Sequence, residues 1–197
     1  EDLESGSRSA IAGGFTSFME MPNTSPPTTS EAALADKLQR ANGRCHADYA
    51  FFIGASPENA EQLTNLEQLP GCAGVKIFMG CSTGSLLVES DDDLDRVLSS
   101  CHRRVAVHAE DYFRLKELKI ANAKADHPRF HPIMRDSEAA ARAVRRLLSL
   151  AEKHKNSVHI LHVSSDKEMQ LLQPYRDNPL VSVEITPNHL LMQAPDC

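Results

Sequence analysis

The chain has 197 residues, of which 41% are hydrophobic and 24% are charged, a balance that excludes collagen-like, coiled-coil and disordered proteins. The net charge is −6 and the acidic residues are spread along the chain, which argues against a nucleic-acid-binding surface. No stretch approaches the ~20 consecutive apolar residues of a membrane-spanning helix, and the first residues lack the basic start and apolar run of a signal peptide.

Short apolar runs alternate with helical segments along the whole chain. Each run is four to seven residues long and most are apolar on both faces, which is typical of parallel strands covered by helices. We expect strands at 15–21, 49–53, 75–79, 105–108, 158–163 and 181–185. Between them lie helix-start signals, among them the capping-box spacings Thr28/Glu31 and Ser165/Glu168. The pattern predicts repeated βα units.

Two architectures produce this alternation, an open doubly wound sheet and a (β/α)₈ barrel. No Gly-x-Gly-x-x-Gly turn follows the first predicted strand, which disfavours a dinucleotide-binding sheet. A barrel has eight strands in about 250 residues, whereas this sequence predicts six. The sequence therefore predicts an α/β fold in which residues 1–197 form a single domain, part of a TIM barrel with units missing at one or both ends.

Three residues in or after these runs are candidates for chemistry. Lys76 lies inside an apolar run, and because burying an ammonium is costly it needs a partner or a modification. His108 and His162 follow β-rich runs, where an inward imidazole could bind a metal. Each of the three alone has an ordinary structural explanation. Together they favour a common site, because the carboxyl ends of successive barrel strands meet at one end of the barrel. His159 is three residues from His162, so we expect the two to point to opposite faces.

Five motifs follow one another along the chain: the segment 13–24 that ends in Met-Pro-Asn-Thr, the lysine run 74–78, the histidine segments 107–110 and 161–164, and the Glu-Ile-Thr-Pro-Asn-His-Leu-Leu segment 184–191. In this order they resemble motifs of the dihydroorotases among the cyclic amidohydrolases. Any one of them is weak, but the ordered set covers nearly the whole chain. The resemblance implies that the six runs are strands 2 to 7 of a metal-dependent amidohydrolase barrel.

The resemblance also implies a site. Lys76 would be carboxylated by CO₂ and would bridge two divalent metals, usually zinc, while His108 and His162 bind one of them. Carboxylation would remove the cost of a buried cation. Asn23 would hydrogen-bond the carboxylate of the substrate. The implied reaction is the interconversion of dihydroorotate and N-carbamoyl-L-aspartate in pyrimidine biosynthesis. The alternatives are a hydantoinase or dihydropyrimidinase, an allantoinase, or an inactive dihydroorotase-like structural partner.

Two family features are not found in the sequence. It contains no His-x-His pair, which the family carries on its first strand, and the general-base aspartate of the eighth strand would lie beyond Cys197. We therefore expect no general base within the chain and no activity of residues 1–197 alone. We expect the protein to bind a small-molecule substrate and neither nucleic acid nor a membrane. A homodimer is a possible oligomeric state. Five cysteines without a Cys-x-x-Cys pair indicate reduced thiols in a cytoplasmic protein.

Overall fold

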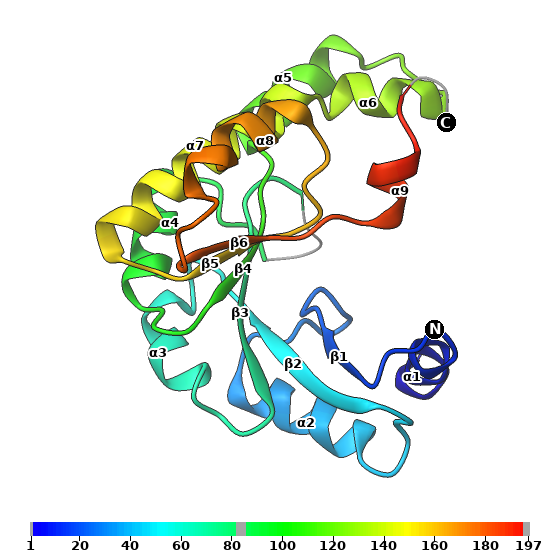
Figure 1. The fold of residues 1–197 in the computed structure, drawn as a ribbon. Helices are drawn as coiled ribbons and strands as arrows, with labels where there is room; N and C mark the ends of the chain where they lie inside the picture. The colour runs from blue at the N-terminus through cyan, green and yellow to red at the C-terminus, as the bar shows by residue number, and fades with distance from the viewer. Residues whose placement is uncertain (1, 82–85, 195–197) are drawn as a thin grey trace.

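The computed structural model describes residues 2–81 and 86–194, and its centre is one sheet of six parallel strands. The strands follow one another in chain order, as Figure 1 shows. They are β1 (Ser17–Glu20), β2 (Asp48–Gly54), β3 (Cys72–Phe78), β4 (Val105–His108), β5 (Val158–Ile160) and β6 (Val181–Val183). Because every neighbouring pair is parallel, the carboxyl ends of all six strands lie at the same edge of the sheet.

Helices fill the connections between the strands. They are α1 (Leu3–Ala12), α2 (Glu31–Ala41), α3 (Leu63–Leu66), α4 (Asp91–Ser99), α5 (Tyr112–Ala121), α6 (His131–Met134), α7 (Ser137–His154), α8 (Asp166–Leu172) and α9 (Pro187–Leu191), with short 3₁₀ turns at Ala60–Gln62, Pro128–Phe130 and Gln173–Tyr175. In Figure 1 the sheet curls, with α2, α3, α4, α7 and α8 along its convex side. No helix in the described part of the chain has the length and apolar character needed to cross a bilayer.

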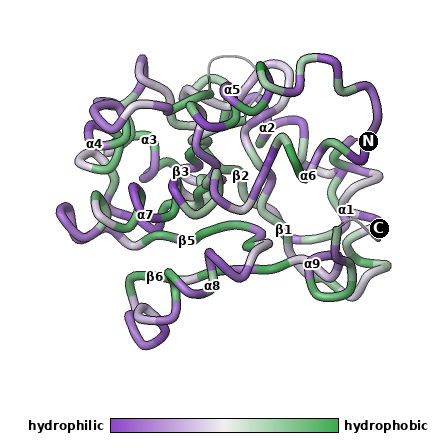
Figure 2. Tube along the Cα trace, turned by 90° about the horizontal axis from the view of Figure 1, so that it is seen from above, coloured by the Kyte–Doolittle hydropathy of each residue, from purple (hydrophilic) through white to green (hydrophobic). Residues whose placement is uncertain are grey.

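The two faces of the sheet are both apolar, as the sequence predicts. Val75 and Ile77 of β3 are fully buried in the main core, together with Leu147 of α7. On the opposite, concave face, Phe52 of β2, Ala106 of β4 and Leu161 form a second, smaller buried cluster. Figure 2 shows the hydrophobic stretch along β5, whose Val158 and Ile160 belong to the main core. We call the concave side the inner face.

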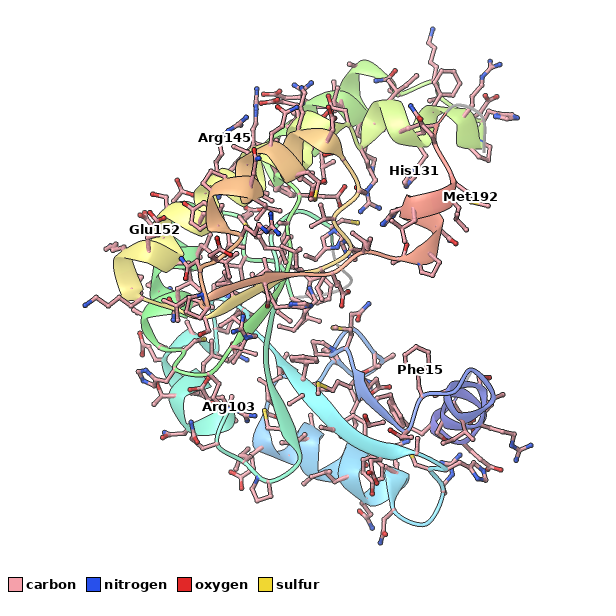
Figure 3. The ribbon with its side chains drawn as sticks, in the orientation of Figure 1. Phe15, Arg103, His131, Arg145, Glu152 and Met192 are labelled. Atoms are coloured by element: carbon pink, nitrogen blue, oxygen red, sulfur yellow. The ribbon has the colours of Figure 1, made fainter. Side chains whose placement is uncertain are left out.

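Apolar side chains are exposed near the edge strands β1 and β6. Phe15, before β1, and Met192, after α9, are 67% and 60% exposed, and both are labelled in Figure 3. Val183 and Ile185, on and just after β6, are also exposed. The described cysteines Cys45, Cys72, Cys81 and Cys101 are free thiols, as predicted, whereas Cys197 lies outside the described residues.

The helix starts agree with the sequence in one case and differ in another. Ser165 is the N-cap of α8, and its hydroxyl and the Glu168 side chain form the predicted capping box. The start expected at Thr28 is wrong, because Ser30 caps α2 by accepting a hydrogen bond from the Ala33 N–H. Thr28 is buried because its backbone is tied to β2, its carbonyl accepting from the Gly54 N–H at 2.8 Å.

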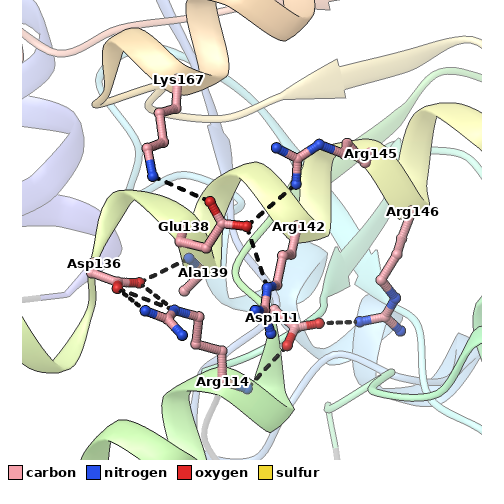
Figure 4. Close-up of polar contacts among 9 residues, drawn as sticks. All are labelled: Asp111, Arg114, Asp136, Glu138, Ala139, Arg142, Arg145, Arg146 and Lys167. Atoms are coloured by element: carbon pink, nitrogen blue, oxygen red, sulfur yellow. Dashed lines mark hydrogen bonds and ion pairs between the residues drawn. The ribbon is translucent and has the colours of Figure 1, made fainter.

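Polar contacts fasten the start of α7 to its neighbours (Figure 4). Asp136 is the N-cap of α7 and also accepts a hydrogen bond from the guanidinium of Arg114 in α5, at 2.9 Å. Asp111, the N-cap of α5, pairs with Arg146 of α7 at 2.7 Å. These contacts hold the segment after β4 and the segment before α7 next to each other. The candidate site described below uses one residue from each segment.

Candidate metal centre

Lys76 lies near the end of β3 and is almost completely buried, with 1% of its surface exposed. Its neighbours across the sheet are Gly54 and Ala106, so its side chain is on the inner face. The Nζ atom donates a hydrogen bond to the Ile77 carbonyl at 2.8 Å and lies 3.7 Å from the ring centroid of Phe78. Burial lowers the pKa of Lys76 well below its ordinary value, against a weaker opposing attraction from Glu184. The fold therefore favours the neutral amine.

His108 and His162 meet at the carboxyl ends of the next two strands. His108 is the last residue of β4, and its Nδ1 lies 2.9 Å from Nε2 of His162. The two rings are edge to face, with 4.8 Å between their centroids. Burial, followed by repulsion from His108, lowers the pKa of His162, so its neutral form is favoured. The ring of Phe78, which contacts Lys76, also lies close to the pair, with 6.0 Å between its centroid and that of His108.

The backbone at His162 overturns one sequence prediction. His159 is in register with Ala106 and Ser182 and bonds Ser182 Oγ through Nδ1 at 2.9 Å, so its side chain is on the inner face. His162 is on the same face, because it contacts His108. The alternation rule fails because β5 ends at Ile160 and His162 has a left-handed φ of 40°. The expectation of opposite faces is therefore wrong.

Sequence reasoning missed Glu110 and Arg135. Nε2 of His108 lies 2.5 Å from a carboxylate oxygen of Glu110, and Nε of Arg135 donates to the other oxygen at 2.8 Å. Arg135 Nη2 also contacts the oxygen that faces His108. Burial acts to raise the pKa of Glu110, but the hydrogen bonds from His108 and Arg135 outweigh it and lower that pKa to about 2. The His-x-Glu spacing after β4 was an available signal, whereas nothing marked Arg135.

The donors present fit part of a metal site. Zinc binds histidine nitrogen at about 2.0–2.1 Å, so two nitrogens on one tetrahedral ion are about 3.3 Å apart. His108 Nδ1 and His162 Nε2 are 2.9 Å apart, close to this spacing, so the two rings would supply two nitrogen donors to one ion. Among residues 2–81 and 86–194, no group of three or more His, Cys, Asp or Glu side chains is arranged to hold a metal. Lys76 would have to supply the further ligand.

Asn23 is exposed in the loop that follows β1, at the edge of the sheet where Lys76, His108 and His162 also lie. This loop is closed by a hydrogen bond from the Thr28 N–H to the Pro22 carbonyl at 3.0 Å. The role of Asn23 toward a substrate stays a prediction, as does metal binding by the other three residues.

Comparison with solved structures defines the class of fold. A comparison with models of protein families finds none that matches the chain. The L-hydantoinase (dihydropyrimidinase) from Arthrobacter aurescens superposes with a TM-score of 0.89 and 27% identity, over 99% of this chain and 45% of the hydantoinase. The curled six-stranded sheet with its outer helices is therefore part of a TIM barrel of the amidohydrolase type, as the sequence predicts.

Within that class, the sequence is similar to dihydroorotases. The dihydroorotase of Pyrococcus furiosus is 32% identical over 200 residues, which cover the whole of this chain and 41% of the relative. That of Methanothermobacter thermautotrophicus is 31% identical, covering 98% of this chain and 43% of the relative. The chain thus spans about two fifths of the length of these relatives. The resemblance to the central part of a dihydroorotase is confirmed.

Proposed function

We propose that these residues are part of the active site of a dihydroorotase, a cytoplasmic enzyme of pyrimidine biosynthesis that interconverts dihydroorotate and N-carbamoyl-L-aspartate. One observation carries the proposal. A buried lysine and two histidines with facing nitrogens occupy the ends of three consecutive strands, in a chain whose whole length matches dihydroorotases. This arrangement would hold a divalent metal, for which zinc suits the nitrogen donors.

Lys76, His108 and His162 would be the metal ligands, and two metals are expected when the family's other ligands are also present. A bound metal lowers the pKa of a water ligand and polarises the carbonyl of a cyclic amide. His162 offers a ring nitrogen whose neutral form is favoured by the lowered pKa of this residue. Asn23, exposed at the same edge of the sheet, would donate its amide N–H to the carboxylate of the substrate.

Lys76 is suited to carboxylation because its burial favours the neutral amine. The nitrogen lone pair would form an N–C bond to CO₂, one C=O electron pair would move to oxygen, and one proton would leave the nitrogen. The product is a carbamate anion whose two oxygens can bridge metals. Carboxylation thereby converts a poorly solvated amine into a ligand, which explains why a lysine is placed at a buried position of β3.

A hydantoinase is the second candidate, and a specific observation favours it: the TM-score of 0.89 to an L-hydantoinase. Both activities hydrolyse a cyclic amide and would use the same lysine and histidines. The sequence favours the dihydroorotase, since identity is 32% to that relative and 27% to the hydantoinase. The Met-Pro-Asn-Thr segment 21–24 points the same way.

The test is an ultraviolet assay of dihydroorotate hydrolysis. It uses a protein that contains this segment together with the regions that its relatives have outside the match. We expect turnover of dihydroorotate in preference to hydantoin, and a loss of at least about 100-fold in the Lys76→Ala variant, because a metal ligand is removed. Lys153→Ala, which changes a lysine 58% exposed on α7, is the control.

Three results bear on the alternatives. Turnover of hydantoin without dihydroorotate would show the second candidate to be correct. Near-normal turnover of dihydroorotate in Lys76→Ala would contradict the carboxylated lysine. Residues 1–197 alone should be inactive even with zinc and bicarbonate, since they contain neither a His-x-His pair nor the expected general base.

A further inference from the structure

Glu110 and Arg135 form a hydrogen-bonded chain that ends on the ring of His108. Both oxygens of Glu110 accept from the guanidinium of Arg135, one of them at 2.8 Å, and one oxygen also contacts His108 Nε2 at 2.5 Å. The His108 and Glu110 side chains are each 14% exposed. Bidentate Arg–carboxylate pairs are among the stronger and more directional contacts in proteins.

This chain determines which nitrogen of His108 carries the proton. Arg135 cannot give up its charge, and a carboxylate that receives both of its donors is an acceptor only. Nε2 of His108 therefore carries the proton that is donated to Glu110, and whenever the ring is neutral its lone pair is on Nδ1. Nδ1 is the atom that faces His162 Nε2. We infer that Glu110 and Arg135 are a positioning pair that holds His108 in the Nε2–H tautomer, with Nδ1 as its metal-binding atom.

The backbone around the pair is built to hold it in place. The Asp111 N–H donates to the Ala139 carbonyl at 2.9 Å, which ties the residue after Glu110 to the first turn of α7. Asp136, next to Arg135, is held by Arg114 (Figure 4). Just after β3, Gly80 packs so closely on Glu110 that a Cβ atom would be 2.2 Å from the Glu110 carbonyl oxygen. Both partners of His108 are thus anchored independently of any ligand.

The metal-binding part of this inference rests on the proposed function, but the tautomer does not. A carboxylate on the second nitrogen of a ligand histidine fixes the ring and strengthens the metal bond, and removing such a partner typically weakens metal binding by about 10–100-fold. The competing interpretation is that the pair only fastens the segment before α7 to the end of β4. That interpretation predicts a change in stability without a change in tautomer.

The decisive experiment is NMR of the histidine ring nitrogens in metal-free protein, with the His108 signals assigned by their loss in His108→Asn. We expect the Nε2–H tautomer in the wild-type chain, and a mixture of tautomers in Glu110→Gln and in Arg135→Gln. Glu138→Gln is the matched control, because Glu138 pairs with Arg142, Arg145 and Lys167 and does not contact His108. An Nδ1–H tautomer in the wild type, or an unchanged Nε2–H tautomer in both variants, would overturn the inference.

The second readout is affinity for Zn²⁺ alone, measured by competition with a chromophoric chelator. We expect Glu110→Gln to bind about 10–100-fold more weakly than the wild type, and Glu138→Gln to bind equally. Equal affinity in wild type and Glu110→Gln would overturn the metal-binding part. If the tautomer is fixed, but a protein that also contains the regions its relatives have outside the match does not turn over dihydroorotate, the proposed function is refuted and the positioning pair stays intact, so the two failures are distinguishable.

Discussion

Lys76→Met tests whether the buried amine of Lys76 lowers the stability of the fold and is present for its chemical role. Methionine has a similar length and volume and no polar group, so it can occupy the same space in β3. In metal-free buffer depleted of CO₂, Lys76 remains an unmodified amine. We then expect the variant to have a higher free energy of unfolding than the wild type.

The magnitude follows from two opposing contributions. Withdrawing a polar group from water costs about 1–3 kcal/mol in proteins. The hydrogen bond from Nζ to the Ile77 carbonyl, at 2.8 Å, returns about 0.5–1.5 kcal/mol. The net gain of Lys76→Met is therefore about 1 kcal/mol, which corresponds to a rise in Tm of about 2–4 °C for a chain of this size.

The pH dependence of the free energy of unfolding is a second test of whether Lys76 destabilises the fold. The pKa of Lys76 is lowered in the folded protein, so the unfolded chain binds more protons below the ordinary lysine pKa of 10.5. The Lys76 side chain should therefore make the free energy of unfolding of the wild type rise as the pH approaches 10.5. The Lys76→Met variant should lack this pH-dependent contribution. Urea titrations between about pH 7 and pH 10 should show the advantage of the variant shrinking as the pH rises.

Lys37→Met is the matched control, because Lys37 is also nearly buried, with 11% of its side chain exposed, but is paired with Glu20 of β1. Removing this lysine leaves the half-buried carboxylate of Glu20, which is 28% exposed, without its partner, and we expect a loss of about 1–3 kcal/mol. The two substitutions should thus shift stability in opposite directions. A loss of more than about 1 kcal/mol in Lys76→Met would refute the argument.

Two further predictions concern the backbone of the site. Gly80→Ala should lower the free energy of unfolding by about 1–3 kcal/mol, because its Cβ would lie 2.2 Å from the Glu110 carbonyl oxygen. Gly13→Ala is the control and should change the free energy of unfolding little, since the nearest atom to its Cβ would be 3.4 Å away. Equal thermal shifts in the two variants would contradict the close packing at Gly80. His162→Gly should be more stable than His162→Val by on the order of 1–2 kcal/mol, because a φ of 40° is strained for a β-branched residue; equal urea midpoints would show that this conformation is not maintained.

The sequence by itself determined the class of fold and the positions of three candidate ligands. Apolar runs such as 75–79 and 105–108 are buried strands in the structure, and the order of βα units predicted a parallel sheet that the structure confirms. Lys76 and His108 lie on regular strands, where alternation and register are local properties of the chain. Local patterns are enough when the backbone repeats regularly, because each residue's face then follows from its neighbours.

Only the tertiary structure decided what these residues contact. His162 is on the inner face because β5 stops at Ile160 and the chain takes a left-handed turn, which no hydrophobic pattern shows. Arg135 is 25 residues from Glu110 in sequence, and the two meet because the start of α7 is fastened back against the end of β4. Hydrogen bonds between segments so far apart depend on how helices pack on the sheet, and that packing is a property of the folded chain as a whole.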